Sequence, residues 1–460
     1  KLRVAYAIVD GVNTQIRYRE TEAEPFRPVL TTNFKEGVSF ATFTPDNKLV
    51  YAITNLGRDK SALVLMDPAT CEELEQLYTN DKYDLGGLWY SDAQKKLLGV
   101  SYEGHKGKTR YFFDKATEEM LGRMERHLRG YEIGIGGSNK AEDKYIVYAG
   151  DDRTMGAYYF YDVKSDTMTK LADLAPWIDE QQMAEMTPVT YTSRDGLEIE
   201  GYLTLPVGKT LHNAKNLPVV VNPHGGPWAR DSWGFNPEVQ LLANRGYAVL
   251  QMNFRGSTGF GRKFTEIAYG KWGQTMQDDI TDGVNWLIEK GIADPSKIAI
   301  YGGSYGGYAT LQGIVKDPDL YACAVDYVGV SNLFSFLQTI PPYWKPMLDM
   351  MYEMVGNPEK DAQMLRENSP ALNAERIKTP LLVVQGANDP RVNINESNQM
   401  VDALRKRGVH VDYMVKDNEG HGFHNEENRF DFYRAMEKFL GKYLKGIEPE
   451  GEIVPESSRR

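Results

Sequence analysis

Short apolar runs alternate with amphipathic stretches over the second half of the chain. The apolar runs are centred near Val219, Val249, Ile298, Val325, Leu382 and Tyr413. Each run has the length of a buried strand, and the stretches between them carry apolar residues at helical spacing, as at Tyr308, Leu311 and Val315. Strands that alternate with helices predict an α/β fold with a doubly wound, mostly parallel sheet. A hairpin around Asp195-Gly196 is predicted to open this sheet.

The first 175 residues carry a repeat in place of this alternation. An apolar strand is followed by an Asp-x-x-Thr or Asp-x-x-Ser turn at Asp67, Asp114 and Asp162, in steps of 47 and 48 residues. Repeats of this length accommodate the four short strands of a β-propeller blade. We therefore predict an N-terminal partial β-propeller of about three to four blades over residues 1–176, with a degenerate first blade around residues 17–21.

These two patterns divide the chain into predicted domains. The propeller pattern ends near Pro176, and the α/β domain is predicted to occupy residues 177–447. Residues 448–460 are polar and contain Pro and Ser, which predicts a loosely held tail. With 41% hydrophobic residues, the 460-residue chain has enough apolar side chains for two buried cores.

Charge and cysteine content narrow the range of partners. The net charge of −11 argues against a nucleic acid partner, and no apolar stretch is long enough to span a bilayer, so we expect a soluble protein without a membrane partner. Cys71 and Cys323 fall in different predicted domains and predict no structural disulfide, which leaves a cytoplasmic or a periplasmic location open. No Cys/His spacing typical of zinc sites occurs, so we expect no metal and no cofactor.

The most informative motif is Tyr301-Gly-Gly-Ser-Tyr-Gly-Gly-Tyr308. It places Ser304 at the centre of G-x-S-x-G, between a predicted strand and a predicted helix. A serine on such a sharp turn has a strained backbone, an exposed Oγ and a helix N-terminus beneath it, where a developing oxyanion meets backbone N–H groups. A glycine-rich loop without a catalytic role is the alternative, and a catalytic serine requires an acid and a histidine farther along the chain.

An acid and a histidine follow in that order. Asp389 ends a predicted strand and its polar loop, and His421 lies between two glycines in the loop after the predicted strand 411–415. The order serine, acid, histidine is the order of α/β-hydrolases. We therefore predict Ser304 as nucleophile, His421 as the base that takes its proton and Asp389 as the acid that orients the imidazole. His424 is the main competitor for the base, but it opens an amphipathic C-terminal helix.

A second glycine motif predicts an oxyanion hole. The strand around Val219 runs into His224-Gly-Gly-Pro227, the type of loop that supplies one backbone donor in such sites. The donors that we predict are the N–H of Tyr305, directly after the nucleophile, and the N–H of Gly226, which we favour over Gly225. A plain glycine turn after a core strand is the alternative when no triad is present.

Together these motifs resemble the prolyl oligopeptidase family of serine peptidases, and within it the branch of acylaminoacyl and dipeptidyl peptidases. The resemblance covers most of the chain. It rests on five motifs in family order, at residues 224–227, 253–261, 302–307, 386–392 and 419–422. It implies an α/β-hydrolase catalytic domain at residues 177–447 behind the N-terminal β-propeller.

Relatives in this family close a ring of about seven or eight blades, which is more than residues 1–176 can hold. Together with the missing initiator methionine, this indicates a fragment or processed form whose remaining blades precede Lys1. If nothing precedes Lys1, the open propeller edge would need a partner or a second copy of the chain, so a homo-oligomer is one expectation.

The resemblance also implies a peptide-binding pocket. Arg391, two residues after the acid, is expected to reach a carbonyl or carboxylate of a short peptide substrate, and an ordinary surface ion pair is the alternative. The pocket for the residue before the scissile bond is expected to be apolar, although plain core packing is the alternative for its residues. Its predicted lining is Val330, Leu333, Phe336 and Val392, with Tyr343 or Trp344 as further candidates.

Substrate specificity stays open at this point. Paired glutamates hold the free amino terminus in dipeptidyl peptidases of the family, and Glu72-Glu73 and Glu118-Glu119 are candidates. Each pair follows the repeated turn, so each is expected to begin an outer, solvated blade strand. Acylaminoacyl, dipeptidyl and oligopeptide cleavage therefore remain alternatives. A carboxylesterase with the same triad is a competing hypothesis, and the three triad residues argue against a non-catalytic binding protein built on a propeller.

Overall fold

The computed structural model describes residues 2–447, which divide into two compact units. The first unit holds residues 2–186, 232–240 and 258–266, and the second holds residues 187–231, 241–257 and 267–447. The first unit therefore extends past Pro176, where the sequence pattern places the boundary, and takes in two later segments. The predicted polar tail at residues 448–460 lies outside the described residues.

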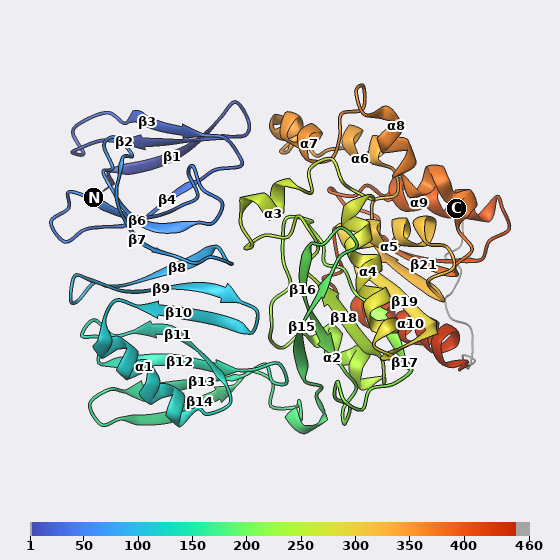
Figure 1. Ribbon diagram of the computed structural model, residues 1–460, viewed down its shortest axis with the longest axis horizontal. Helices are drawn as coiled ribbons and strands as arrows, with labels where there is room; N and C mark the ends of the chain where they lie inside the picture. Colours follow the sequence, from blue (N-terminus) through green and yellow to red (C-terminus); the bar gives the residue numbers. More distant parts are fainter. Residues whose placement is uncertain (1, 448–460) are drawn as a thin grey trace. The chain divides into compact units, whose positions relative to one another are not determined.

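Four small antiparallel sheets make up most of the first unit (Figure 1). Sheet by sheet, the strands are β1 (Val4–Val9), β2 (Asn13–Tyr18) and β3 (Arg27–Thr32); β4 (Val38–Phe43), β5 (Val50–Thr54), β6 (Ala62–Met66) and β7 (Glu73–Thr79); β8 (Leu85–Ser91), β9 (Lys96–Gly104) and β10 (Gly107–Phe112); and β11 (Glu132–Ser138), β12 (Lys144–Gly150), β13 (Ala157–Asp162) and β14 (Thr167–Asp173). Each sheet pairs strands that are consecutive in the chain, in antiparallel register. This is the construction of propeller blades.

Alternation along the inner strands explains how these sheets pack. In β5, Val50 and Ala52 are fully buried in a cluster with Ile16 of β2, whereas Ile53 packs into a second cluster with Leu85 of β8. Successive side chains of a strand point to opposite faces, so one strand contributes to two cores. An inner sheet of this unit is therefore buried on both faces.

The repeat that contains the turn at Asp114 differs from the prediction. The sequence pattern predicts an outer strand after this turn, but the structure has helix α1 (Lys115–His127). Asp114 is its N-cap, because its Oδ2 accepts hydrogen bonds from Thr117 N at 3.0 Å and from Thr117 Oγ1 at 2.6 Å. The strand prediction was wrong because an N-capping aspartate and buried apolar residues at helical spacing, such as Met124, favour a helix here. Glu118-Glu119 therefore lies in α1 rather than in a blade strand.

The later segments 232–240 and 258–266 join the first unit through specific hydrogen bonds. Asp84 N donates to Gly259 O at 2.9 Å, and the Asp84 carboxylate accepts from Gly261 N at 2.9 Å. Gln240 Nε2 donates to Asp152 O at 2.8 Å. The partners lie far apart in the sequence, so no local pattern predicts these contacts.

An eight-stranded sheet forms the core of the second unit (Figure 1). Its strands are β15 (Met186–Thr192), β16 (Glu198–Thr204), β17 (Leu217–Val221), β18 (Ala248–Met252), β19 (Ala293–Gly303), β20 (Cys323–Tyr327), β21 (Leu381–Gly386) and β22 (Val411–Lys416), in the spatial order β15-β16-β18-β17-β19-β20-β21-β22. β16 pairs with β18 in antiparallel register, and the pairs from β18 to β22 are parallel. The predicted α/β class with a mostly parallel sheet is confirmed.

Helices connect the parallel strands in the sequence, and one more follows the last strand. They are α2 (Pro237–Asn244), α3 (Arg262–Glu266), α4 (Thr275–Glu289), α5 (Tyr305–Lys316), α6 (Leu333–Gln338), α7 (Leu348–Met354), α8 (Ala362–Glu367), α9 (Ile394–Arg405) and α10 (Glu426–Lys445). α5 and α10 both pack against β19 and β20. Every residue of β18 and β21 is buried, as expected for central strands of a parallel sheet covered by helices.

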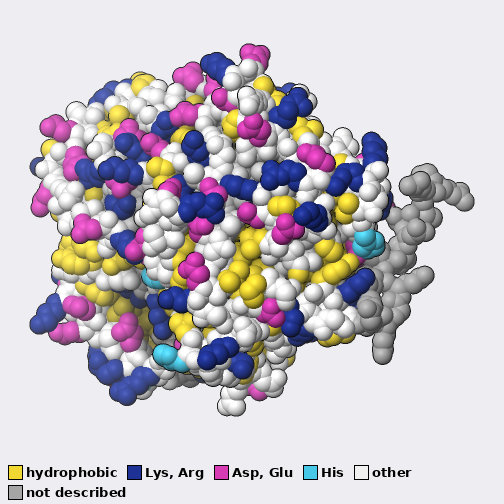
Figure 2. Space-filling model, turned by 45° about the vertical axis from the view of Figure 1, so that its right-hand side comes forward, with side chains coloured by type: hydrophobic (Ala, Val, Ile, Leu, Met, Phe, Trp, Pro, Cys, Tyr) yellow, Lys and Arg dark blue, Asp and Glu magenta, His cyan; other side chains and the backbone are white. Residues whose placement is uncertain are grey.

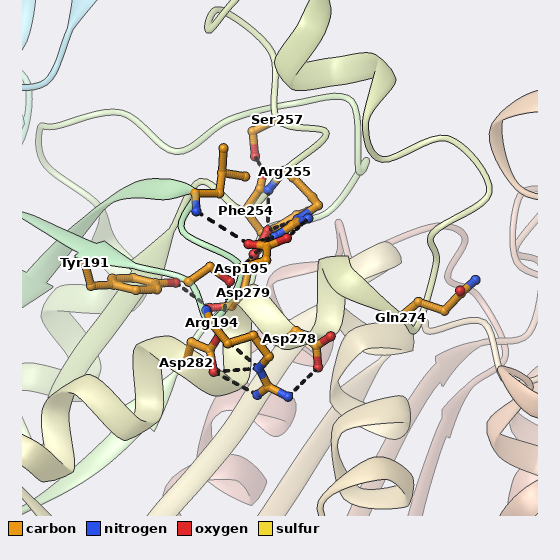
Figure 3. A network of polar contacts seen from close by, with 12 residues as sticks. Tyr191, Arg194, Asp195, Phe254, Arg255, Ser257, Gln274, Asp278, Asp279 and Asp282 are labelled. Atoms are coloured by element: carbon orange, nitrogen blue, oxygen red, sulfur yellow. Dashed lines mark hydrogen bonds and ion pairs between the residues drawn. The ribbon is translucent and has the colours of Figure 1, made fainter.

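A network of charged side chains ties the loop after β18 to α4 and to the β15–β16 hairpin (Figure 3). Arg255 is buried, and its guanidinium donates to Asp279 Oδ2 at 2.8 Å and to Asp279 Oδ1 at 2.7 Å. Asp195, at the hairpin turn, accepts from the same guanidinium at 2.7 and 2.9 Å, and Ser193 Oγ donates to Asp279 Oδ1 at 2.7 Å. The loop that carries Arg255 is thereby fixed at a buried ion pair.

Glu419 fixes the loop that leads into α10. Its buried carboxylate accepts hydrogen bonds from the N–H groups of His424 and Asn425, both at 2.9 Å, and from Asn428 Nδ2 at 2.8 Å. Burial alone would raise the pKa of Glu419, but these hydrogen bonds stabilise the carboxylate and lower its pKa to about 2. An ionised side chain therefore holds residues 417–425 in place.

We expect Asp279→Asn to lower the free energy of unfolding of the second unit by about 3–5 kcal/mol, because it leaves the buried Arg255 charge without its carboxylate partner. Guanidinium chloride unfolding followed by circular dichroism measures the loss. Asp195→Asn is the matched control, since the Asp195 side chain is 45% exposed and its replacement is expected to cost about 1 kcal/mol or less. Equal losses in the two variants would contradict the anchoring role of the Arg255–Asp279 pair.

Glu419→Gln is expected to lower the free energy of unfolding by about 2–3 kcal/mol at neutral pH, because an amide offers one acceptor oxygen where a carboxylate offers two. Unfolded glutamate has a pKa of about 4.3, so the folded protein binds fewer protons than the unfolded chain between that value and about 2. The wild type therefore exceeds Glu419→Gln in free energy of unfolding by the full amount above about pH 5, and this difference shrinks as the pH falls through this range. Urea unfolding of both proteins from neutral pH to about pH 3 measures the difference. A difference that does not change with pH contradicts the role of the ionised carboxylate.

Candidate active site

Ser304 lies on the turn between β19 and α5, with φ 59° and ψ −117°. Residues with a side chain rarely adopt this conformation, so the turn holds strain at Ser304. The turn also depends on two glycines. A Cβ at Gly302 would lie 2.5 Å from the carbonyl carbon of Gly306, and a Cβ at Gly306 would lie 2.2 Å from Pro223 O. Since neither position has room for a side chain, the sharp turn requires both glycines.

Ser304, His421 and Asp389 form a continuous chain of hydrogen bonds. His421 Nε2 lies 3.0 Å from Ser304 Oγ, and His421 Nδ1 lies 2.7 Å from Asp389 Oδ2. Because a carboxylate only accepts hydrogen bonds, Nδ1 carries the proton and Nε2 accepts from the serine hydroxyl. The three residues follow β19, β21 and β22, whose carboxyl ends lie at one edge of the parallel sheet. In this geometry an imidazole can take the serine proton.

The turn after β21 orients Asp389. The Asp389 side chain is fully buried, and its Oδ1 accepts hydrogen bonds from the N–H groups of Arg391 at 2.8 Å and Val392 at 2.9 Å. The other oxygen, Oδ2, is the one that meets His421. Two backbone donors therefore hold the carboxylate with its other oxygen at the histidine.

Tyr327, the last residue of β20, connects the serine turn with the histidine loop. Its carbonyl oxygen accepts a hydrogen bond from Ser304 N at 2.9 Å, and its hydroxyl accepts one from Phe423 N. His424, the competing histidine, is exposed just before α10 and contributes its backbone N–H to Glu419. Of the two histidines, His421 is the one that meets Ser304.

The loop after β17 lies against the serine turn. A Cβ at Gly225 would be 3.1 Å from Gly303 O and 3.5 Å from Ser304 Cβ. Gly226 lines the cavity beside Ser304 together with Tyr305, whose N–H is the first of α5 and has no acceptor within the helix. Gly226 and Tyr305, which the sequence predicts as the oxyanion donors, thus both line the cavity at Ser304.

A cavity of about 510 Å³ opens at Ser304. It is lined by Gly226, Trp228, Trp272, Ser304, Tyr305, Val330, Phe336, Trp344, Met347, Met350, Met351, Arg391, Val392 and His421. Most of the predicted pocket residues are among them. Leu333 is not, because it is fully buried at the start of α6, where plain core packing accounts for it, and Tyr343 is 57% exposed and does not line the cavity either.

Five lining residues were not predicted from the sequence: Trp228, Trp272, Met347, Met350 and Met351. The Trp272 ring packs edge to face on Tyr305, with ring centroids 4.7 Å apart. The methionines come from α7 and the turn before it. Their spacing of three and four residues is helical and could have indicated a common face, and Trp228 directly follows the glycine loop.

Glu396 links the two walls of the cavity. Its buried carboxylate accepts hydrogen bonds from the N–H groups of Ser331 at 2.9 Å and Asn332 at 2.8 Å, and burial raises its pKa. Glu396 lies in the first turn of α9, just after Val392, and Ser331 directly follows Val330. One carboxylate therefore sets the position of Val330 relative to Val392.

Arg391 brings a positive charge to the cavity. Arg391 is exposed at the cavity, and no residue of the described chain pairs with its guanidinium.

No group of three or more His, Cys, Asp or Glu side chains within residues 2–447 is arranged to hold a metal ion. Basic and acidic side chains are interspersed on the face seen in Figure 2. None of the helices in the described part of the chain has the length and apolar character needed to cross a membrane.

Comparison with known proteins gives the family. Residues 233–446 match the prolyl oligopeptidase family. Dipeptidyl aminopeptidase BIII of Pseudoxanthomonas mexicana is 39% identical over 441 residues, which cover 94% of this chain and 63% of that protein. Dipeptidyl peptidase family member 6 of Caenorhabditis elegans is 34% identical over 428 residues, which cover 88% of this chain and 57% of that protein. The chain thus spans about three fifths of the length of these relatives.

A solved structure confirms the predicted fold class. The crystal structure of a puromycin hydrolase aligns with a TM-score of 0.80 at 23% identity, over 98% of this chain and 69% of that one. At this identity the likeness concerns the fold, which combines an N-terminal propeller with an α/β-hydrolase domain. With the family match and the two relatives, these findings show that the chain belongs to the prolyl oligopeptidase family of serine peptidases.

Proposed function

We propose that this chain is a serine peptidase that hydrolyses short peptides through Ser304, His421 and Asp389. The observation that carries the proposal is the hydrogen-bonded chain at the strained turn, with 3.0 Å between Ser304 Oγ and His421 Nε2 and 2.7 Å between His421 Nδ1 and Asp389 Oδ2. Family membership and the apolar cavity beside Ser304 support the same reaction.

In the acylation half of the reaction, His421 Nε2 takes the Ser304 proton while Oγ attacks the substrate carbonyl carbon. Asp389 stabilises the imidazolium that forms. The N–H groups of Tyr305 and Gly226 stabilise the negative charge on the carbonyl oxygen. The imidazolium then gives its proton to the leaving amine, and the C–N bond breaks to leave an acyl-enzyme.

Deacylation repeats these roles with water. His421 takes a proton from a water molecule, the hydroxide adds to the acyl carbon, and the same two N–H groups stabilise the second oxyanion. The proton returns to Ser304 Oγ as the ester bond breaks. The peptide acid leaves, and the free enzyme is restored.

The cavity supports a large apolar residue before the scissile bond. Its walls contain the buried side chains of Val330, Phe336, Met351 and Val392. An apolar substrate side chain of about the size of Phe or Leu would be transferred from water into these apolar surroundings, which favours its binding. Arg391 is exposed at the cavity and without a partner among the described residues. A guanidinium in that position suits a substrate carbonyl or carboxylate.

Support for dipeptide release comes from the two relatives described above, which are dipeptidyl peptidases by name. If dipeptides are released, the free amino group at the amino terminus of the substrate would separate substrates of this chain from N-acylated peptides. Neither candidate glutamate pair is assigned to that amine, because Glu73 forms an ion pair with Arg58 and Glu118-Glu119 lies in α1. Acylaminoacyl release and ester hydrolysis are the competing specificities.

The proposed activity is tested with three chromogenic substrates that share one apolar residue: a free-amine dipeptidyl anilide, an N-acetylated aminoacyl anilide and a short-chain ester. We expect the highest kcat/KM on the dipeptidyl anilide. Ser304→Ala is expected to lower turnover about 10⁴-fold or more without loss of folding, because the nucleophile is removed. Circular dichroism of the variant is the control. Unchanged turnover in Ser304→Ala would sink the assignment, and preference for the acetylated anilide or for the ester alone would replace dipeptide release by the competing specificity.

Arg391→Ala is expected to lower kcat/KM on the peptide anilide about 10- to 100-fold, because hydrogen bonds between a charged group and the substrate are lost. The short ester does not reach the guanidinium, so its kcat/KM should change about twofold or less. Arg434→Ala is the matched control, since Arg434 lies on α10 with a side chain that is 71% exposed. Equal losses on both substrates contradict a substrate-binding role for Arg391.

A further inference from the structure

A second cavity lies between the start of α4, the end of α5 and α8. Its volume is about 730 Å³, and all of its lining residues belong to the second unit. None of them lines the cavity at Ser304. Small-molecule sites in proteins have volumes of about 300–1,000 Å³, so this cavity has room for a ligand of its own.

Gln312, on α5, contributes a buried acceptor without a donor to this cavity. Its side chain is 3% exposed. Asn368 Nδ2 donates to Met364 O at 2.9 Å, so the Asn368 oxygen is the atom that remains for Gln312, and Gln312 Nε2 donates to it at 3.4 Å. This contact leaves Gln312 Oε1, for which none of the described residues supplies a hydrogen bond. A buried acceptor without a partner is costly, and a ligand N–H would satisfy it.

The start of α4 adds further groups without partners. Thr275 is the first residue of this helix and lines the cavity, and its Oγ1 is buried without a hydrogen-bond partner among the described residues. No side chain caps the helix at Gln274. The first N–H groups of a helix have no acceptor within it and carry partial positive charge, which favours a negative ligand group nearby.

Charged side chains of both signs complete the lining. Lys316 and Asp278 neutralise each other, with 2.8 Å between Lys316 Nζ and Asp278 Oδ1. The remaining charged residues of the lining are exposed, and within the described chain none of them forms an ion pair: Lys360, Asp361, Glu367 and Arg376. Two free cations and two free carboxylates around one cavity suit a ligand that itself carries both charges.

We propose that this cavity is a second binding site, which takes a short peptide with a free amino group and a free carboxylate. Lys360 and Arg376 bind the carboxylate, Asp361 and Glu367 attract the ammonium group, and Gln312 Oε1 accepts a hydrogen bond from a peptide N–H. A dipeptide released by the proposed reaction has this chemistry. The identification of the ligand as a reaction product therefore rests on the proposed function, whereas the site itself rests on the residues that line it.

The test uses enzyme whose Ser304 has been sulfonylated with phenylmethanesulfonyl fluoride, so that the active cavity is filled. Alanyl-leucine is titrated into this protein by isothermal titration calorimetry, and we expect a single dipeptide to bind per chain. Alanyl-leucinamide lacks the carboxylate, and N-acetyl-alanyl-leucine lacks the ammonium group. Each should bind about tenfold or more weakly, because charge-assisted hydrogen bonds are lost.

Three variants locate the site. Lys360→Ala and Arg376→Ala should each lower the affinity for alanyl-leucine about tenfold. Gln312→Leu keeps a side chain of similar size without the acceptor and should lower it about three- to tenfold. Lys378→Ala is the matched control and should bind as the wild type, since Lys378 does not line the cavity and its side chain is 66% exposed. If Gln312→Leu does not fold, the two variants at exposed residues still decide the result.

Binding to untreated enzyme alone would place the dipeptide in the active cavity and overturn the inference. Equal affinity for the three peptides, or unchanged affinity in Lys360→Ala and Arg376→Ala, would overturn it as well. A wild type that hydrolyses none of the anilides is a different outcome, which removes the proposed function itself. The same variants, titrated without sulfonylation, would then decide whether the second site exists.

Discussion

The close approach of the backbone at Gly306 to Pro223 O is the constraint on which the rest of the site depends. A Cβ at Gly306 would lie 2.2 Å from that oxygen, so the serine turn and the loop after β17 can meet only where no side chain intervenes. β17 and β19 are parallel neighbours, and their carboxyl ends therefore bring both loops to the same edge of the sheet. The strained φ of 59° at Ser304 is a consequence, since it is the conformation that turns the chain sharply from β19 into α5. The pairing of β17 with β19 thereby sets how closely the loop after β17 lies against the serine turn.

Buried carboxylates then hold the loops that the sheet itself does not reach. Asp389 accepts two backbone N–H groups in its own loop, Glu419 accepts two at the start of α10, and Glu396 accepts two in the loop after β20. Loops are generally the mobile part of a fold, and a buried carboxylate that accepts several backbone donors gives a loop one preferred arrangement. Arg255 has the same function with the opposite charge, because its guanidinium and backbone N–H both bind Asp279. The site is therefore ordered by charged groups of which only Asp389 belongs to the proposed triad.

The sequence predicts those features whose determinants are local. G-x-S-x-G, with a strand before it and a helix after it, indicates where Ser304 lies, and the order of Asp389 and His421 on later strand ends follows from the parallel sheet; the structure brings the three side chains within hydrogen-bond distance. Predictions were wrong where a local signal was ambiguous, as at Asp114, which forms a helix cap in one repeat although related turns precede strands in the others. Features made by long-range contacts had no local signal, as in the membership of residues 232–240 and 258–266 in the first unit. For Met347, Met350 and Met351 the helical spacing indicates a common face, but no local pattern says that this face lines the cavity.

The two halves of the site differ in stiffness, and this difference bears on specificity. The side of the site at the serine turn consists of backbone whose contacts at Gly302 and Gly306 leave no room for side chains, whereas one wall of the cavity consists of Met347, Met350 and Met351. Methionine side chains are unbranched and polarizable, so this wall can adapt to apolar side chains of different shape. An adaptable apolar pocket separates substrates by only about 1–3 kcal/mol per methylene, which is too little to define one cleavage site. Strong discrimination requires polar groups that are left unpaired by the wrong substrate. Among the described residues none pairs with the guanidinium of Arg391 at this cavity. In the peptidase reaction that we propose, the position of the substrate's carbonyl or carboxylate should therefore determine the cleavage site more than the identity of its apolar side chain does.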